Sequence, residues 1–113
     1  MDGKALVRAY YRSIDEDDYA TLTDVLTGEF VHRRPDTTIE GRAEFVAFMR
    51  SGRPERDTEH SLEAIYRADD DRIAAEGRLL HADGSEWFGF VDVFRIGDNG
   101  VRSIRTYTDT PPT

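Results

Sequence analysis

A single carboxylate stands among aromatic and aliphatic residues near the C-terminal end of the sequence. The stretch EWFGFVDVFRIG, residues 86–97, alternates as a β-strand does, and Asp92 shares its phase with Phe90 and Phe94. Because successive strand residues point to opposite faces of a sheet, we expect Asp92 on an otherwise apolar face. A buried carboxylate is costly unless it is paired, hydrogen-bonded or protonated. The pattern therefore marks Asp92 as a candidate site residue.

Two basic side chains on an earlier predicted strand could act beside this carboxylate. His32 and Arg34 are two residues apart, so a strand over residues 29–34 places both on one face. Histidine has a pKa of about 6.5, which suits a general base at neutral pH. Arginine can hold a carboxylate through two parallel hydrogen bonds, so Arg34 could anchor an anion. The structural alternatives are a histidine at the sheet rim and an Arg34–Asp92 ion pair.

The other two histidines are weaker candidates. His60 shares phase with Leu62, Ala64 and Tyr66 and could reach the same cavity, although a place near the start of a strand also allows exposure. His81 falls in a predicted turn. The three histidines lack the spacing typical of metal ligands, and the chain has no cysteine. We therefore expect no metal, no thiolate nucleophile and no cofactor.

Helical and strand periods predict the elements that position these residues. Helices are expected over residues 4–16, from 19 to near 28, and over 42–51; strands are expected over 29–34, 58–68, 72–82 and twice within 86–109. The sequence Gly97–Asp98–Asn99–Gly100 is typical of a tight hairpin turn. Helices first and a strand meander afterwards predict an α+β fold. Three N-terminal helices should pack on one face of a curved, mainly antiparallel sheet of four to five strands.

Length and charge limit the classes of function. A chain of 113 residues is expected to form one domain, residues 1–113. The net charge of −8 disfavours nucleic acid as a partner, because an acidic surface repels phosphates. The excess of acids, with Lys4 as the only lysine, resembles proteins of salt-loving organisms, although an ordinary acidic protein is the alternative. No apolar run approaches the roughly 20 residues that span a bilayer, and no signal-peptide core is present, so we expect a cytoplasmic protein with no membrane partner.

Three stretches together resemble one protein family. They are ALVRAYYRSIDEDDYATLTDVLTGEFVHRRP, with two helices and a strand that ends in proline, IEGRAEFVAFM, with a third helix, and VDVFRIGDNGVRSIRTY, with a hairpin. Their order and spacing resemble the SnoaL-like branch of the nuclear transport factor 2-like superfamily, and the ketosteroid isomerases. The resemblance covers nearly the whole chain and implies a cone-shaped α+β barrel. This scaffold hosts isomerases, cyclases, hydrolases, dehydratases and non-catalytic binders, so it does not by itself define a function.

The resemblance assigns roles to some residues and removes the usual bases. Ketosteroid isomerases hold an oxyanion with a first-helix tyrosine and a protonated hairpin aspartate, and Tyr10 and Asp92 align with these positions. Tyr10 could instead be a core tyrosine with a satisfied hydroxyl. The isomerase base precedes the first strand's proline, where this chain has Arg34, and SnoaL-type cyclases use a last-strand aspartate, where it has Thr106. Arginine keeps its proton near neutrality and a threonine hydroxyl is no base without a partner, so neither standard route of proton abstraction carries over.

Two hypotheses follow. In the first, the protein binds a small, partly apolar molecule with an anionic group and isomerises, cyclises or hydrates it. In this hypothesis His32 is the base. Tyr10 and Asp92 donate hydrogen bonds to the substrate or orient it, and the substrate is also held by Arg34, Thr106 and His60. In the second, the chain is a non-catalytic ligand-binding or dimerisation module in which Arg34 neutralises Asp92. A buried Arg34–Asp92 pair without a cavity would favour the second; an accessory subunit of a larger complex is a third reading.

The predicted hairpin has apolar residues on both phases. Trp87, Val91 and Val93 fall on the phase opposite to Asp92, and an apolar outer face on a small sheet is typical of an interface. Members of the superfamily often dimerise through that face, so we expect a homodimer that buries Trp87. On the inner face, the small residues Ala75 and Gly77 are expected to leave space for a ligand.

Overall fold

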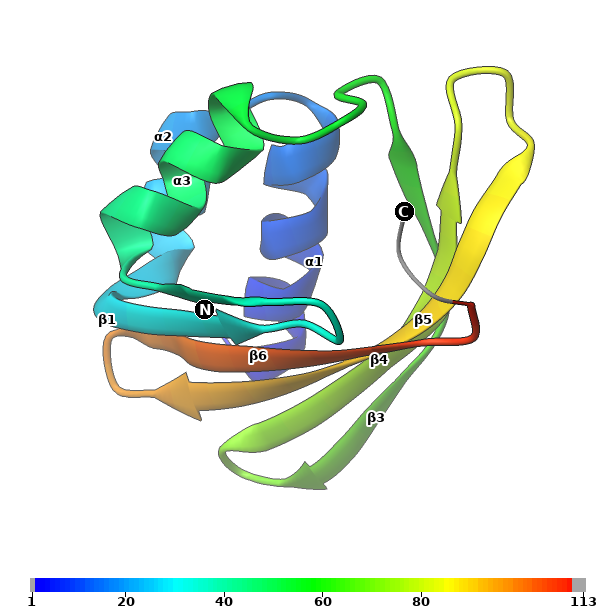
Figure 1. Ribbon diagram of the computed structural model, residues 1–113. Coiled ribbons are helices and arrows are strands. Elements are labelled where there is room, and N and C mark those ends of the chain that lie inside the picture. The colour runs from blue at the N-terminus through cyan, green and yellow to red at the C-terminus, as the bar shows by residue number, and fades with distance from the viewer. Residues whose placement is uncertain (1, 111–113) are drawn as a thin grey trace.

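The computed structural model describes residues 2–110, in which three helices lie on one side of a curved six-stranded sheet (Figure 1). The elements are α1 (Gly3–Asp15), α2 (Tyr19–Val25), β1 (Leu26–Arg33), β2 (Thr38–Glu40), α3 (Arg42–Ser51), β3 (Glu59–Asp69), β4 (Arg72–Leu80), β5 (Glu86–Gly97) and β6 (Gly100–Thr108). The predicted α+β class, with three N-terminal helices on one sheet face, is confirmed.

The strands form one mixed sheet in the order β2–β1–β6–β5–β4–β3. Strands β1 and β6 run parallel, and every other neighbouring pair is antiparallel. The expected four to five strands were too few, because the three residues of β2 are too short to show an alternation. Their pairing places Ile39 opposite His32. The sheet is strongly curved but does not close, so β2 and β3 remain its edges.

Aspartates cap the N-termini of the first two helices. The Asp2 carboxylate accepts from the Ala5 amide at 2.8 Å and caps α1, as such side chains do at helix starts. Asp18 caps α2 in the same way, through the Thr21 amide. Between the helices Asp17 has φ of 55°, the left-handed region that aspartate tolerates better than most residues. The acidic run therefore ends one helix and begins the next.

The second helix is shorter than predicted and the first strand is longer. Helix α2 ends at Val25, and Leu26 is already extended and paired with Val101 of β6. Both Val25 and Leu26 are buried. Because pairing with β6 begins at Leu26, the chain changes from helix to strand without the expected break near Gly28.

A dense apolar core fills the narrow part of the space between helices and sheet. Fully buried side chains come from each layer, among them Val7 of α1, Phe45 of α3, and Phe94 and Ile104 of the hairpin. The Tyr10 ring stacks edge-on against Phe94, with ring centroids 5.4 Å apart. This packing holds α1 and α3 against the sheet and leaves the wider end for a cavity.

Trp87 does not lie where the alternation placed it. The β4–β5 register shifts between Leu79, which pairs with Phe88, and Leu80, which pairs with Glu86. Trp87 is thus the extra residue of a β-bulge, a feature that re-aims a side chain. It lines the cavity on the inner side of the sheet and is not part of the outer face. The prediction for Trp87 was wrong because it assumed an unbroken strand.

The outer face of the sheet combines apolar and charged residues. One row crosses β3, β4, β5, β6 and β1 and consists of Tyr66, Ala74, Val93, Arg105 and Arg33. At one end Tyr66 is 55% exposed and donates to Glu76, whereas the other end carries the two arginines. An acidic end and a basic end on the same face can complement each other when a second copy is turned by a two-fold axis.

We propose that two copies of the chain associate through this outer face. Val93→Asp would place a carboxylate at its centre and is expected to convert dimers into monomers, because a buried unpaired charge is costly. Light scattering at micromolar concentration measures the change. Asp70→Asn, in an exposed turn, is the control that should not alter assembly. A wild-type chain that is monomeric under these conditions would contradict the proposal.

Candidate active site

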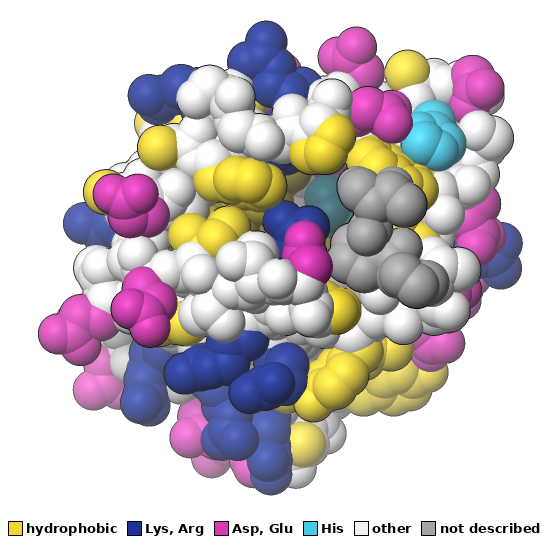
Figure 2. All heavy atoms as spheres, viewed as in Figure 1, with side chains coloured by type: hydrophobic (Ala, Val, Ile, Leu, Met, Phe, Trp, Pro, Cys, Tyr) yellow, Lys and Arg dark blue, Asp and Glu magenta, His cyan; other side chains and the backbone are white. Residues whose placement is uncertain are grey.

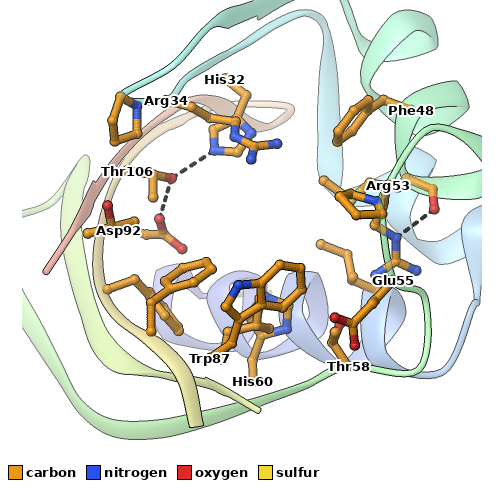
Figure 3. A pocket seen from close by; sticks show the side chains of 18 of the residues that line it. His32, Arg34, Phe48, Arg53, Glu55, Thr58, His60, Trp87, Asp92 and Thr106 are labelled. Carbon is orange, nitrogen blue, oxygen red and sulfur yellow. Dashed lines mark hydrogen bonds between the residues drawn. The ribbon is translucent and has the colours of Figure 1, made fainter. Parts of the chain in front are cut away.

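A cavity of about 130 Å³ lies between the inner face of the sheet and helices α1 and α3 (Figure 3). The space-filling view shows a hollow in this face of the molecule, with basic and histidine side chains inside it (Figure 2). The cavity brings together all six residues that the sequence singled out, namely Tyr10, His32, Arg34, His60, Asp92 and Thr106. They come from α1, from β1 and the turn after it, and from β3, β5 and β6.

Asp92 is buried and accepts two short hydrogen bonds. The Tyr11 hydroxyl donates to its Oδ2 at 2.5 Å, and the Thr106 hydroxyl donates to its Oδ1 at 2.5 Å. Thr106 is the cross-strand partner of Asp92, so the β5–β6 register itself brings the two together. Burial raises the pKa of Asp92, and the hydrogen bonds from Thr106 and Tyr11 partly oppose that rise.

The tyrosine that holds Asp92 is Tyr11, which the sequence analysis missed. Val7, Tyr11 and Ile14 form a helical stripe that is as regular as the one containing Tyr10. Both tyrosines are buried, and burial raises the pKa of each phenol, so both remain protonated donors. Tyr10 also lines the cavity, and its hydroxyl makes no hydrogen bond to another residue within 2–110. The Tyr10 hydroxyl can therefore donate a hydrogen bond to a ligand, whereas the Tyr11 hydroxyl already donates to Asp92.

His32 extends the hydrogen-bond chain beyond Thr106. Its Nε2 lies 2.8 Å from the Thr106 hydroxyl, whereas its buried Nδ1 has no partner among the described residues (Figure 3). Burial, and then the charge of Arg34, lower the pKa of His32 to about 3, so the ring is neutral near pH 7. When Asp92 is ionised, the Thr106 hydroxyl proton points to it, and His32 must then donate from Nε2. The chain runs from His32 through Thr106 to Asp92.

Arg34 does not pair with Asp92. Its guanidinium lies over the Phe48 ring, 5.5 Å from the centroid, and its Nε is 3.4 Å from the Asp36 carboxylate. Among the described residues no ion pair joins Arg34 and Asp92. The expected ion pair between Arg34 and Asp92 is therefore not formed: two hydroxyls bind the carboxylate, and Arg34 acts on it only from a distance, as a charge that partly opposes the rise that burial causes in its pKa.

A second arginine, Arg53, lines the same cavity. Its Nε donates to the Met49 carbonyl at 2.7 Å, and its Nη2 lies 3.3 Å from the Asp17 carboxylate. Figure 3 shows Arg53 on a different side of the cavity from Arg34. Arg53 was not predicted, because it follows the end of α3 in a segment without a periodic pattern.

His60 is more enclosed than the sequence suggested, with 16% of its side chain exposed. Its Nδ1 lies 2.6 Å from Oδ1 of Asp15, and its backbone amide donates to Oδ2 of the same carboxylate at 3.0 Å. Asp15, the last residue of α1, was hidden in the acidic run of the sequence. His81 lies outside the cavity lining and stacks on Trp87.

The small residues of β4 do not create the space in which a ligand could lie. Ala75 and Gly77 are absent from the cavity lining, and Ala75 is fully buried in the core. A side chain at Gly77 would collide with the Ser61 carbonyl of β3, so this glycine permits close strand approach. The cavity is bounded instead by aromatic side chains, Phe48, Trp87, Phe88 and Phe90.

Residues 2–110 contain neither a cluster of metal-binding side chains nor a membrane-spanning helix. Nowhere in this range do three or more His, Asp or Glu side chains gather in a way that could hold a metal ion. None of the helices within it is both long and apolar enough to cross a membrane.

The SnoaL-like domain model matches residues 7–104, and the chain belongs to this family. A putative ketosteroid isomerase from Kribbella flavida has a TM-score of 0.80 and 20% identity, covering 96% of this chain and 82% of that one. An NTF2-like protein of unknown function from Mesorhizobium loti has a TM-score of 0.78 and 21% identity, covering 95% and 90%. A putative polyketide cyclase from Sinorhizobium meliloti has a TM-score of 0.78 and 12% identity, covering 91% and 94%. No curated protein matches the chain significantly in sequence.

The two adjacent tyrosines give a matched test of the Asp92 environment. Tyr11→Phe removes one donor from a buried carboxylate and should lower the free energy of unfolding by about 1.5–3 kcal/mol, the usual range for a hydrogen bond to a charged group. Tyr10→Phe removes a hydroxyl without a protein partner and should change stability much less. Urea unfolding at pH 7 measures both. Equal losses in the two variants would contradict the assigned hydrogen bond.

Acid should destabilise the fold through His32. Its pKa is about 3 in the folded protein and about 6.5 in an unfolded chain. The stability that the neutral ring contributes is thus complete above about pH 6.5 and is lost as the pH falls towards 3. Between about pH 7 and pH 5 the wild type should lose about 2 kcal/mol more than His32→Gln. Urea unfolding at both pH values, with His81→Gln as control, checks this; equal pH slopes in wild type and His32→Gln would refute it.

Proposed function

We propose that the protein binds a small, partly apolar molecule with an anionic group and isomerises, cyclises or hydrates it by acid–base chemistry. One observation carries the proposal: an aromatic cavity has arginine on its wall and a buried, hydrogen-bonded carboxylate, Asp92, beside it. The names of two structural neighbours, a putative ketosteroid isomerase and a putative polyketide cyclase, belong to the same broad classes.

Cavity size and lining limit the ligand. Apolar protein cavities of about 150 Å³ hold a molecule such as benzene, and this one has about 130 Å³. Phe48, Trp87 and Phe90 offer ring faces and edges to an apolar body. A ligand with one ring, or a branched chain of similar size, fits these limits.

Arg34 is suited to hold an anionic group on that ligand. Its side chain is 23% exposed, and its partner Asp36 is 47% exposed at 3.4 Å, so the existing ion pair is weak. A ligand carboxylate could replace Asp36 with two parallel hydrogen bonds. Arg53, which lines the same cavity, adds a second positive charge.

Tyr10 supplies the donor for a developing negative charge. Its phenol is protonated because burial raises its pKa; the charges of Asp92 and Asp15 add to that rise, and those of Arg34 and Arg53 oppose it. Tyr10 lines the cavity, and its hydroxyl has no hydrogen-bond partner within residues 2–110. A fixed donor in a water-poor site stabilises an oxyanion more than water does.

The proposal of His32 as the base meets two physical obstacles. Its Nε2 is used by Thr106, and a pKa of about 3 makes its neutral ring a weak proton acceptor. Ligand binding without turnover is the second candidate function, and it is favoured by Arg34 and Thr106 at the positions where the family resemblance places a base.

Arg34→Ala tests the anion site. With cyclohexanecarboxylate as probe, we expect affinity to fall about 10- to 100-fold, equivalent to the loss of one charged hydrogen bond. Calorimetric titration measures the affinity, and thermal unfolding checks that the variant folds. Arg102→Ala is the matched control, because Arg102 is exposed and does not line the cavity. The proposal would be contradicted if Arg34→Ala bound the probe as tightly as wild type, or if wild type bound the neutral carboxamide as tightly as the carboxylate.

A further inference from the structure

His60 lines the cavity, and its partner Asp15 lies behind it, outside the lining; the pair has no role in the hydrogen-bond chain around Asp92. Asp15 ends α1 and His60 lies at the start of β3, so the fold brings together residues that are distant in the sequence. Both carboxylate oxygens of Asp15 bind His60, one through the ring Nδ1 and one through the backbone amide. Such two-point attachment fixes both the position and the rotation of the imidazole.

This attachment also determines which ring nitrogen carries the proton. An ionised Asp15 can only accept, so Nδ1 of His60 must donate to it. In the neutral ring Nε2 then has a free lone pair, and no residue in the described part of the chain bonds to it. The ring packs against Tyr11 and Phe90, with centroids 4.9 Å and 5.7 Å away, and lines the cavity. His60 therefore differs from His32: the unbonded ring nitrogen of His32, Nδ1, is buried, whereas Nε2 of His60 is not among the buried unpaired atoms within residues 2–110.

We propose that His60 is the general base of this cavity and that Asp15 is the residue that positions it. The inference rests on the proposed function and makes it more specific. Arg34 lies across the cavity from His60 (Figure 3), so a molecule whose anionic group binds Arg34 extends towards His60. The substrate class is a small, ring-sized carboxylate with a carbonyl group, an acidic C–H next to it and a carbon–carbon double bond beyond that C–H; in a saturated ketone the same proton abstraction gives exchange alone.

The step balances without a co-reactant. Nε2 of His60 takes the proton from the carbon beside the carbonyl, and the electrons of that C–H bond form an enolate. The Tyr10 hydroxyl donates a hydrogen bond to the enolate oxygen. The imidazolium is stabilised by Asp15 and returns the proton to a conjugated carbon. The product is an isomer, and His60 is again neutral.

Asp92 is less suited to this role. Both of its oxygens already accept from hydroxyl groups, those of Tyr11 and Thr106, and its carboxyl group is buried. Abstraction by Asp92 would have to break one of these short bonds. His60 can accept a proton without losing any contact that the structure shows.

Proton abstraction can be measured without knowing the natural substrate. The probe is 4-oxocyclohexanecarboxylate, whose C–H groups beside the ketone exchange with deuterium in heavy water, as followed by proton NMR. We expect wild type to accelerate exchange and His60→Gln to lose at least about 100-fold of that acceleration, the lower end of a general base's contribution. Probe affinity should stay within about two-fold. His81→Gln is the matched control and should exchange as wild type does.

A second measurement tests the positioning role of Asp15. Nitrogen-15 spectra of the labelled imidazoles should show the His60 proton on Nδ1 in wild type and a mixture of tautomers in Asp15→Asn. A purely structural role would not predict the accompanying loss of exchange, which we expect to be about 10-fold. If His60→Gln does not fold, His60→Asn is the substitute, with thermal unfolding as the check.

The outcomes separate this inference from the function on which it rests. A probe that does not bind in an Arg34-dependent way overturns the proposed function and, with it, the catalytic role of His60. A probe that binds through Arg34 but exchanges equally well in wild type and His60→Gln overturns only this inference. A neutral His60 with its proton on Nε2 also overturns it.

Discussion

The buried carboxylate of Asp92 constrains the arrangement of the whole cavity. Leaving it without partners in the interior would be costly, and its two hydroxyl donors come from opposite layers, Tyr11 from α1 and Thr106 from β6. The bond to Tyr11 fixes how α1 is rotated against the sheet. Asp15 lies four residues further along the helix, on the same side. The rotation that satisfies Asp92 therefore also brings Asp15 to His60.

The two histidines of the cavity are held in opposite neutral tautomers, because a different ring nitrogen of each one donates a hydrogen bond. His32 donates from Nε2 to Thr106 when Asp92 is ionised, so its N–H group is used within the protein. His60 donates from Nδ1 to Asp15 and keeps Nε2 free. The same residue type can thus support the carboxylate network in one wall and face a ligand in the other. The difference comes from which ring nitrogen meets the acceptor.

The sequence predicted the fold well and the site in part, for physical reasons that differ by residue. Alternation identified Asp92 because its strand is regular around it. The bulge at Trp87 breaks the period, so the face predicted for Trp87 was the wrong one. Helical spacing could not separate Tyr10 from Tyr11, because both sides of α1 are buried there. Asp15 lies in an acidic run, and Arg53 follows a helix end, so neither has a local pattern. Their roles depend on contacts between distant segments.

At the two positions where the family resemblance places a base, this chain has Thr106 and Arg34. Thr106 faces Asp92 across the β5–β6 ladder, where a second carboxylate would repel the first, and its hydroxyl donates instead. In our proposal Arg34 holds an anion where the resemblance places a proton acceptor, and Arg53 is a second cation in the same lining. A base beside these cations would resist protonation unless a negative charge offset them. In our proposal that charge is Asp15, which explains why the base lies on the far wall, on β3, and is a histidine paired with a carboxylate.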